Sequence, residues 1–62
     1  MLTRDTISRI WKARADLSKA IMNLHAAKID ASPAEIMSLS RVILALTDER
    51  KKLSTLLGES DG

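Results

Sequence analysis

The side chains best suited to chemistry in this sequence are its arginines and lysines, which bind phosphate groups through charge-assisted hydrogen bonds. Ten of the 62 residues are lysine or arginine and eight are aspartate or glutamate, so the net charge is only +2. The candidate nucleic-acid contacts are Arg4, Arg9, Lys12, Lys51 and Lys52. If the fold brings the two ends of the chain together, these cations form a cluster that attracts the phosphates of RNA or DNA.

The same cations are also typical of an ordinary solvated helix surface. Asp5 precedes Arg9 by four residues. Lys12 precedes Asp16 by the same distance, and opposite charges at this spacing on a helix form ion pairs. Trp11 is the single aromatic residue, so the chain lacks a platform on which single-stranded bases stack. Both interpretations stay open.

Catalytic and metal-binding chemistry lacks its required partners. His25 is the single histidine and the sequence has no cysteine, so a metal site would need several carboxylates beside it. No hydroxyl residue of the second half has a histidine base nearby for nucleophilic catalysis. Asp48 and Glu49 are adjacent in sequence, so on a helix they point to different sides. We expect a protein that is not an enzyme, without catalytic residues, metal, cofactor or small-molecule substrate.

Composition indicates a small helical domain that needs a partner copy. Two glycines and one proline are few, as is typical of helical chains. No apolar run approaches the roughly 18 residues of a membrane span, and the first residues do not resemble a signal peptide, so we expect a cytoplasmic protein. A chain of this size buries only about 60% of its unfolded surface, and without cysteine it has no disulfides. Oligomerisation is the remaining source of stability.

A strong helix-start signal lies at the middle of the chain. Ser32 is a good helix cap, Pro33 suits the first helical position, and Glu35 can reach back to close a capping box. Pro33 also disfavours helical angles at the preceding residue, so one long helix cannot run through this point. The chain should therefore fold back on itself.

The outer helix ends have weaker signals. Thr3 is a plausible first cap, and Gly58 is a natural residue to end the second helix. The predicted organisation is a helical hairpin over 1–58, with helices at about 4–28 and 33–57, a turn at 29–31 and a mobile acidic tail at 59–62. The fold class is all-α.

Apolar residues recur at alternating steps of three and four in both helices, which is the heptad pattern of coiled coils. The residues expected in the core or interface are Ile7, Ile10, Trp11, Leu17, Ile21, Leu24, Ile36, Leu39, Ile43, Leu46, Leu53 and Leu57. An antiparallel pairing of the two stripes predicts the layers Ile7 with Leu53, Leu17 with Ile43, Ile21 with Leu39 and Leu24 with Ile36.

The same register places two arginines in the apolar seam. Arg14 is expected opposite Leu46, and Arg50 opposite Ile10, in neighbouring layers. A polar residue at such a position lowers stability but can fix register or oligomeric state. The alternatives are that the charged heads reach water while the stems line the seam, or that the pair binds an anion or a partner.

Partners for these arginines are also predicted. The candidate carboxylates are Asp16, Asp48 and Glu49. Trp11 is expected to stack on Arg50 as a cation–π pair.

The apolar stripe is wider than a two-helix seam requires. Beside the seam lie Ala13, Ala20, Ala27, Met22, Met37, Val42, Leu44 and Leu56. We expect two hairpins to pair as an antiparallel four-helix bundle, because the alanines allow another helix to approach closely. The alternative is that this face binds a different protein.

In length and layout the chain resembles the Rop family of plasmid copy-number proteins, which are short helical hairpins that dimerise into four-helix bundles and bind paired RNA loops. The resemblance carries no motif, so it implies no contact residues. The stretch Ser40-Arg41-Val42-Ile43-Leu44 is comparable to the Ser-Gln-x-x-Asp motif of small sporulation-type aspartyl-phosphate phosphatases. The glutamine and the aspartate are missing here, which argues against phosphatase activity.

The function expected from the sequence is a small protein-interaction or regulatory module, of the kind that phage or plasmid genes encode. It would act through its helix faces, as a homodimeric coiled coil. The alternative is a regulator that binds RNA or DNA through the basic end of the hairpin.

Overall fold

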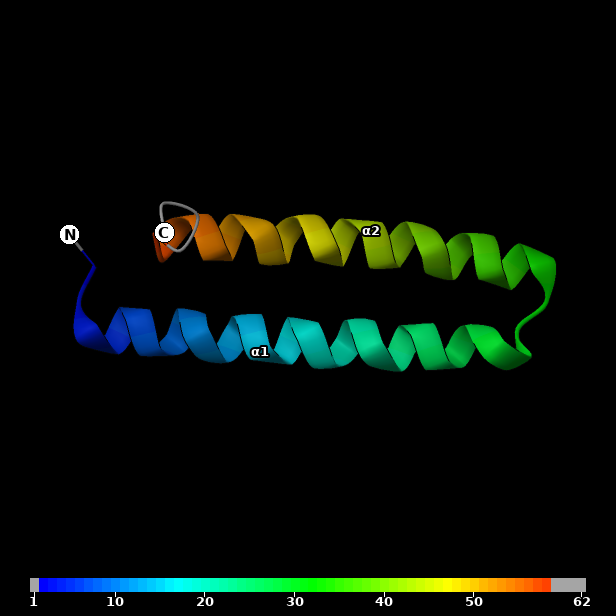
Figure 1. Ribbon diagram of the computed structural model, residues 1–62, viewed down its shortest axis with the longest axis horizontal. Helices are drawn as coiled ribbons and strands as arrows, with labels where there is room; N and C mark the ends of the chain where they lie inside the picture. Colours follow the sequence, from blue (N-terminus) through cyan, green and yellow to red (C-terminus); the bar gives the residue numbers. More distant parts are fainter. Residues whose placement is uncertain (1, 59–62) are drawn as a thin grey trace.

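The computed structural model describes residues 2–58 and shows a helical hairpin (Figure 1). Helix α1 spans Arg4–Ala27, a short 3-10 helix η1 spans Lys28–Asp30, and helix α2 spans Pro33–Leu56. The two long helices run antiparallel, side by side, and no strand occurs within the described residues. The all-α fold and the helical hairpin are therefore confirmed.

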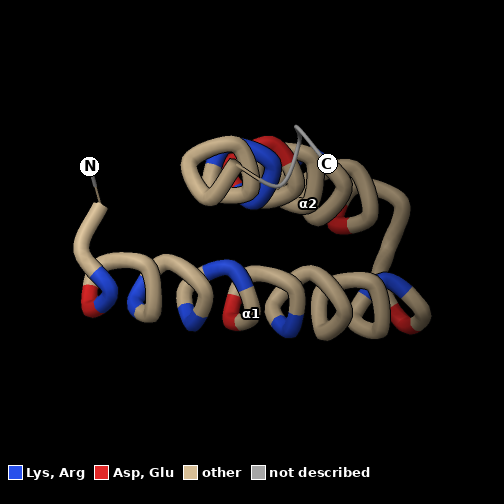
Figure 2. The backbone as a smooth tube through the Cα atoms, turned by 60° about the vertical axis from the view of Figure 1, so that its left-hand side comes forward, with Lys and Arg blue, Asp and Glu red and all other residues tan. Residues whose placement is uncertain are grey.

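Charged positions lie mostly on the outer sides of the hairpin. Figure 2 shows most of the charged positions of α1 turned away from α2. Neither helix in the described part of the chain combines the length and apolar character that a membrane span requires.

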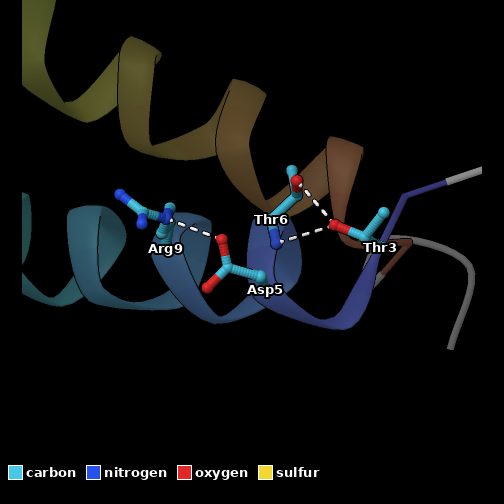
Figure 3. A network of polar contacts seen from close by, with 4 residues as sticks. All are labelled: Thr3, Asp5, Thr6 and Arg9. Carbon is cyan, nitrogen blue, oxygen red and sulfur yellow. Dashed lines mark hydrogen bonds and ion pairs between the residues drawn. The ribbon is translucent and has the colours of Figure 1, made fainter.

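The first helix begins at a threonine cap. Thr3 has extended backbone angles, and its hydroxyl oxygen accepts a hydrogen bond from the Thr6 N–H at 3.1 Å (Figure 3). This bond satisfies one of the N–H groups that have no partner in the first turn. Asp5 adds a negative charge in that turn, where the helix dipole favours it.

The second helix begins with the predicted capping box. The Ser32 hydroxyl oxygen accepts from the Glu35 N–H at 3.3 Å, and the Ser32 N–H donates to Glu35 Oε1 at 2.9 Å. Pro33 occupies the first turn, where a missing N–H costs nothing. The predicted helix start is confirmed in each of its three parts.

Gly58 follows the end of α2, as predicted. Its φ is +77°, a left-handed conformation that glycine adopts without steric cost. Its N–H donates to the Thr55 carbonyl oxygen at 3.0 Å. The predicted mobile tail, 59–62, lies outside the described residues.

The seam between the helices is narrow. Among the described residues, Ile21 and Ile43 are the only buried ones. The other predicted core residues are half-buried, except Trp11, which is exposed. Arg14 and Arg50 are half-buried at the seam positions, and so is Lys28.

Two hydrogen bonds between the helices report their register. Arg14 Nη1 donates to Ser54 Oγ, and Arg50 Nη1 donates to Ser18 Oγ, each at 3.2 Å. In the predicted register Arg14 faces Leu46, which is about 12 Å along the axis from Ser54 at 1.5 Å per residue. Because the helix axes are also separated by roughly 8–10 Å, an arginine side chain cannot span that gap.

The bonds instead place Arg14 about level with Arg50, which shifts α2 by roughly half of the seven-residue repeat. Arg14 then reaches Ser54, one helical turn beyond Arg50, and Arg50 reaches Ser18, one turn beyond Arg14. The same shift sets Ile21 level with Ile43, the two buried residues. Figure 1 shows this displacement: α2 starts beyond the end of α1 and ends short of its start. The predicted layers are therefore wrong, although the two buried residues, Ile21 and Ile43, are both among the predicted core residues.

The capping box predicts a measurable loss of stability in Ser32→Ala. Removing the serine hydroxyl leaves the Glu35 N–H without its partner, so the free energy of unfolding should fall by about 1 kcal/mol. Urea denaturation followed by circular dichroism, at one fixed protein concentration, measures this change. Ser8→Ala is the matched control, since Ser8 is exposed inside α1, and it should not lower stability. Equal losses in both variants would contradict the capping role.

The capping box also predicts a pH dependence. The Ser32 backbone N–H and, to a smaller extent, its side chain hold the pKa of Glu35 below its ordinary value. As the pH falls, the Glu35 carboxylate therefore binds a proton in the unfolded chain before it does so in the folded chain. The stabilisation is fully present above the unfolded pKa of about 4.3 and is lost as the pH falls through the folded pKa. An NMR titration should show the lowered pKa, and Ser32→Ala should return it toward the ordinary value. An unchanged Glu35 pKa in the variant would contradict the assignment.

Candidate functional site

The two seam arginines form a polar cluster in the open half of the hairpin. Their partners are serine hydroxyls, Ser18 and Ser54, rather than the predicted carboxylates. Asp48 and Glu49 instead pair with Lys52 at 3.3 Å. The arginines contact serines rather than these carboxylates because their heads emerge on the side of the seam that hydroxyl residues flank.

Trp11 stacks on Arg14, not on Arg50 as predicted. The Arg14 guanidinium carbon lies 4.0 Å from the centroid of the indole ring, within the range of a cation–π interaction. Trp11 and Arg14 are three residues apart on one helix, where side chains are neighbours. The half-buried arginines with polar contacts at their heads agree with the interpretation that their stems line the seam.

The basic end of the hairpin is interrupted by acidic partners. Arg9 Nε lies 2.9 Å from Asp5 Oδ2 (Figure 3), as the spacing predicts. Lys52 donates hydrogen bonds to the carboxylates of Glu49 and Asp48, and these bonds raise its pKa. These salt bridges are exposed, so they add little stability, but they reduce the charge available for phosphates.

The remaining candidate nucleic-acid contacts are exposed. Arg4, Lys12 and Lys51 each lie on the surface. In residues 2–58, no ion pair joins Lys12 to Asp16, contrary to the spacing argument. His25 is also exposed.

Two faces flank the seam, one on each side. Ser18 and Ser54 each follow a seam arginine by four residues, and they lie on the side where the arginine heads emerge. Ala27 and Glu35 each directly precede a seam residue. They lie on the other side of the seam, where both line one hollow. This agrees with antiparallel coiled-coil geometry, in which equivalent flanking positions of the two helices meet.

The first face, which we call the methionine face, consists of Trp11, Met22, Ile29, Met37 and Leu44. Its side chains are large and strongly exposed: Ile29 is 81% exposed, Met22 71% and Leu44 70%. Trp11 lies near the arginine cluster, and the other four lie toward the turn. Exposed apolar patches of this kind are typical of surfaces that bind another molecule.

The second face, which we call the alanine face, consists of Ala13, Ala20, Ala27, Val42 and Leu56. Val42 and Leu56 are exposed, as are Ala13 and Ala27. At the turn end of this face is a hollow of about 510 Å³. Its lining residues are Ala27, Asp30, Ala31, Ala34, Glu35, Ser38 and Leu39.

Sequence reasoning missed the serine partners, the hollow and the exposure of Ile29. A signal for the serines existed, because Ser40, Thr47 and Ser54 recur every seven residues beside the seam and all are half-buried. The hollow depends on the path of the turn, which the sequence pattern does not specify.

The arginine cluster predicts that Arg50→Leu stabilises the hairpin. Leucine adds apolar contact at this half-buried position, whereas arginine loses part of the hydration of its charged head there. The free energy of unfolding should therefore rise by about 1 kcal/mol. Chemical denaturation at fixed concentration measures the change. The control Arg41→Leu, at an exposed position of α2, should change stability by less than about 0.5 kcal/mol. A destabilised Arg50→Leu would show that the hydrogen bond to Ser18 outweighs the apolar packing.

No protein-family model matches the chain, and no match was found among curated proteins or among solved structures.

Proposed function

We propose that this protein is a non-enzymatic interaction module that acts through its apolar helix faces, as a homodimeric four-helix bundle. The observation that carries the proposal is the imbalance between core and surface. Two residues are buried among those described, while eight large apolar side chains are exposed. Seven of the eight, all but Leu2, gather on the two faces beside the seam instead of scattering around both helices, and clustered exposure of this kind marks an interface.

The two faces support different roles. The alanine face suits close helix packing, because small side chains let a second helix approach. The methionine face carries flexible thioether side chains, Met22 and Met37, which adapt to the shape of a bound protein. We assign the dimer contact to the alanine face and the partner protein to the methionine face.

The nucleic-acid alternative has weaker support. Two of its five candidate contacts, Arg9 and Lys52, are already paired with carboxylates. The remaining cations attract phosphates, but no aromatic platform accompanies them. Binding to RNA or DNA is therefore an outcome of the test and not the proposal.

The proposal predicts a dimer of twice the 6.8 kDa chain mass in sedimentation equilibrium. It also predicts that a photo-crosslinking residue at Leu44 captures a partner protein in the source cells. The matched control carries the same residue at Lys19, which is exposed on the polar side of α1, and should capture none.

A folded monomer would contradict the homodimer. Equal capture from both positions would contradict the methionine face as a specific surface. Binding of an RNA hairpin that weakens steeply between about 50 and 200 mM salt, and is lost in Arg9→Glu or Lys51→Glu, would favour the nucleic-acid function instead.

A further inference from the structure

We infer that the second copy of this chain packs on the alanine face with its turn at the opposite end, so that Leu56 of each copy fills the turn-end hollow of the other. This inference rests on the proposed homodimer and specifies its face, orientation and central contact.

The accessible surface is too large for a monomer of this mass and fits a dimer. The chain exposes 4919 Å², whereas a folded monomer of 6.8 kDa is expected to expose about 4,000 Å². The excess is about 900 Å², and a standard interface removes about 800 Å² from each partner. One copy of the same chain therefore suffices to bring the exposed area to that of a compact protein.

The positions of Leu56 and the hollow match a two-fold axis at the middle of the hairpin. With Arg14 level with Arg50, Leu56 lies near the open end, about 15 Å from the middle of the hairpin at 1.5 Å per residue. The hollow around Ala27 and Ala31 lies about the same distance from the middle, toward the turn. A two-fold axis through the middle and perpendicular to the helices therefore carries each Leu56 onto the hollow of the other copy.

Size and chemistry at the two sites are complementary. Leu56 is 59% exposed on the same face as the hollow, and the hollow volume of about 510 Å³ has room for a branched side chain. Three of its lining residues, Ala27, Ala31 and Ala34, are alanines that leave this space open. Burying an exposed leucine in an apolar site is favourable by about 25 cal/mol per Å² of apolar surface.

Charge favours opposite over parallel orientation of the two hairpins. Seven basic residues lie in the open half against four acidic ones, Asp5, Asp16, Asp48 and Glu49, which leaves an excess of three positive charges there. The seven are Arg4, Arg9, Lys12, Arg14, Arg50, Lys51 and Lys52. A dimer with both turns at the same end would place two such clusters together. In the opposite orientation, each basic end lies beside the other turn, where Asp30 and Glu35 border the hollow.

The methionine face is less suited to self-association. Arg14 and Arg50 direct their charged heads to that side, and a two-fold contact across it would remove water from both guanidinium groups, which costs free energy even for a paired charge. Neither seam arginine emerges on the alanine face. Its charged residues are Glu35, which caps α2, and Glu49, which pairs with Lys52, so contact on this face does not desolvate the arginine heads.

The first experiment compares Leu56→Glu with Leu44→Glu in the full chain. Both positions are exposed leucines of α2 on opposite faces, so the two variants match in chemistry. Leu56→Glu should weaken the dimer by about a hundredfold or more, because both symmetric contacts are lost, while Leu44→Glu should leave the dissociation constant nearly unchanged. Sedimentation equilibrium gives the constants, and circular dichroism at high protein concentration reports the helical content of each variant.

The second experiment uses disulfide formation, since the sequence has no cysteine. Leu56→Cys combined with Ala31→Cys places two thiols at opposite ends of one hairpin (Figure 1), too far apart to bridge within it. Mild oxidation should give a covalent dimer only with the double variant, because Leu56 meets Ala31 of the other copy. Leu56→Cys alone should stay unlinked, as the two Leu56 positions lie at opposite ends of the dimer.

The outcomes separate the inference from the proposed function. A dimer that survives Leu56→Glu but dissociates in Leu44→Glu would overturn the inference and keep the homodimer. Efficient linking by Leu56→Cys alone would show the parallel orientation and also overturn it. A monomeric unmodified chain would remove the homodimer itself.

Discussion

Two helices packed side by side can bury only one stripe of each, and this constraint governs the whole molecule. The seam of α1 and α2 is mostly apolar, with Arg14, Arg50 and Lys28 at three of its positions. It buries only two residues among those described, both near its centre. Every other apolar seam residue keeps part of its surface in water. The hairpin therefore has a defined shape, set by its caps and turn, without the enclosed core that gives a domain independent stability.

The arginines at the centre of the open half follow from the same constraint. In a fully enclosed core, two cations level with each other would be prohibitively costly. In a two-helix seam, Arg14 and Arg50 line the contact with their stems and bring their heads out beside Ser54 and Ser18. The side on which the arginine heads emerge matters for assembly, because it makes one flank cationic in the open half while the alanine face carries neither arginine head.

Helix positions and seam residues could be predicted from the sequence because local chemistry specifies them. Ser32, Pro33 and Glu35 act within one turn of helix, and heptad spacing selects the stripe that faces the neighbour. Register could not be predicted in the same way, because a heptad stripe fits its partner at several displacements. The 3-10 turn of η1 carries the chain further before it reverses, and this extra length shifts α2 by the amount that the arginine–serine bonds record. The predicted stacking of Trp11 on Arg50 depended on the register across the seam, whereas the observed stacking on Arg14 joins two residues three positions apart on one helix.

In the proposed dimer, the alanine faces are enclosed between the two hairpins and the methionine faces point outward on opposite sides of the bundle. Two-fold symmetry makes these outer faces identical, so the assembly presents two equivalent binding surfaces that cannot contact the same small ligand. Each surface combines exposed Met22 and Leu44 toward the turn with the arginine cluster toward the open end. In this proposal, a partner helix that covers its length would combine an apolar face with acidic residues at one end, because negative charge there complements the two guanidinium groups. Two copies of the same surface would instead bring like charges together, so the proposed partner on this side differs in sequence from the chain itself.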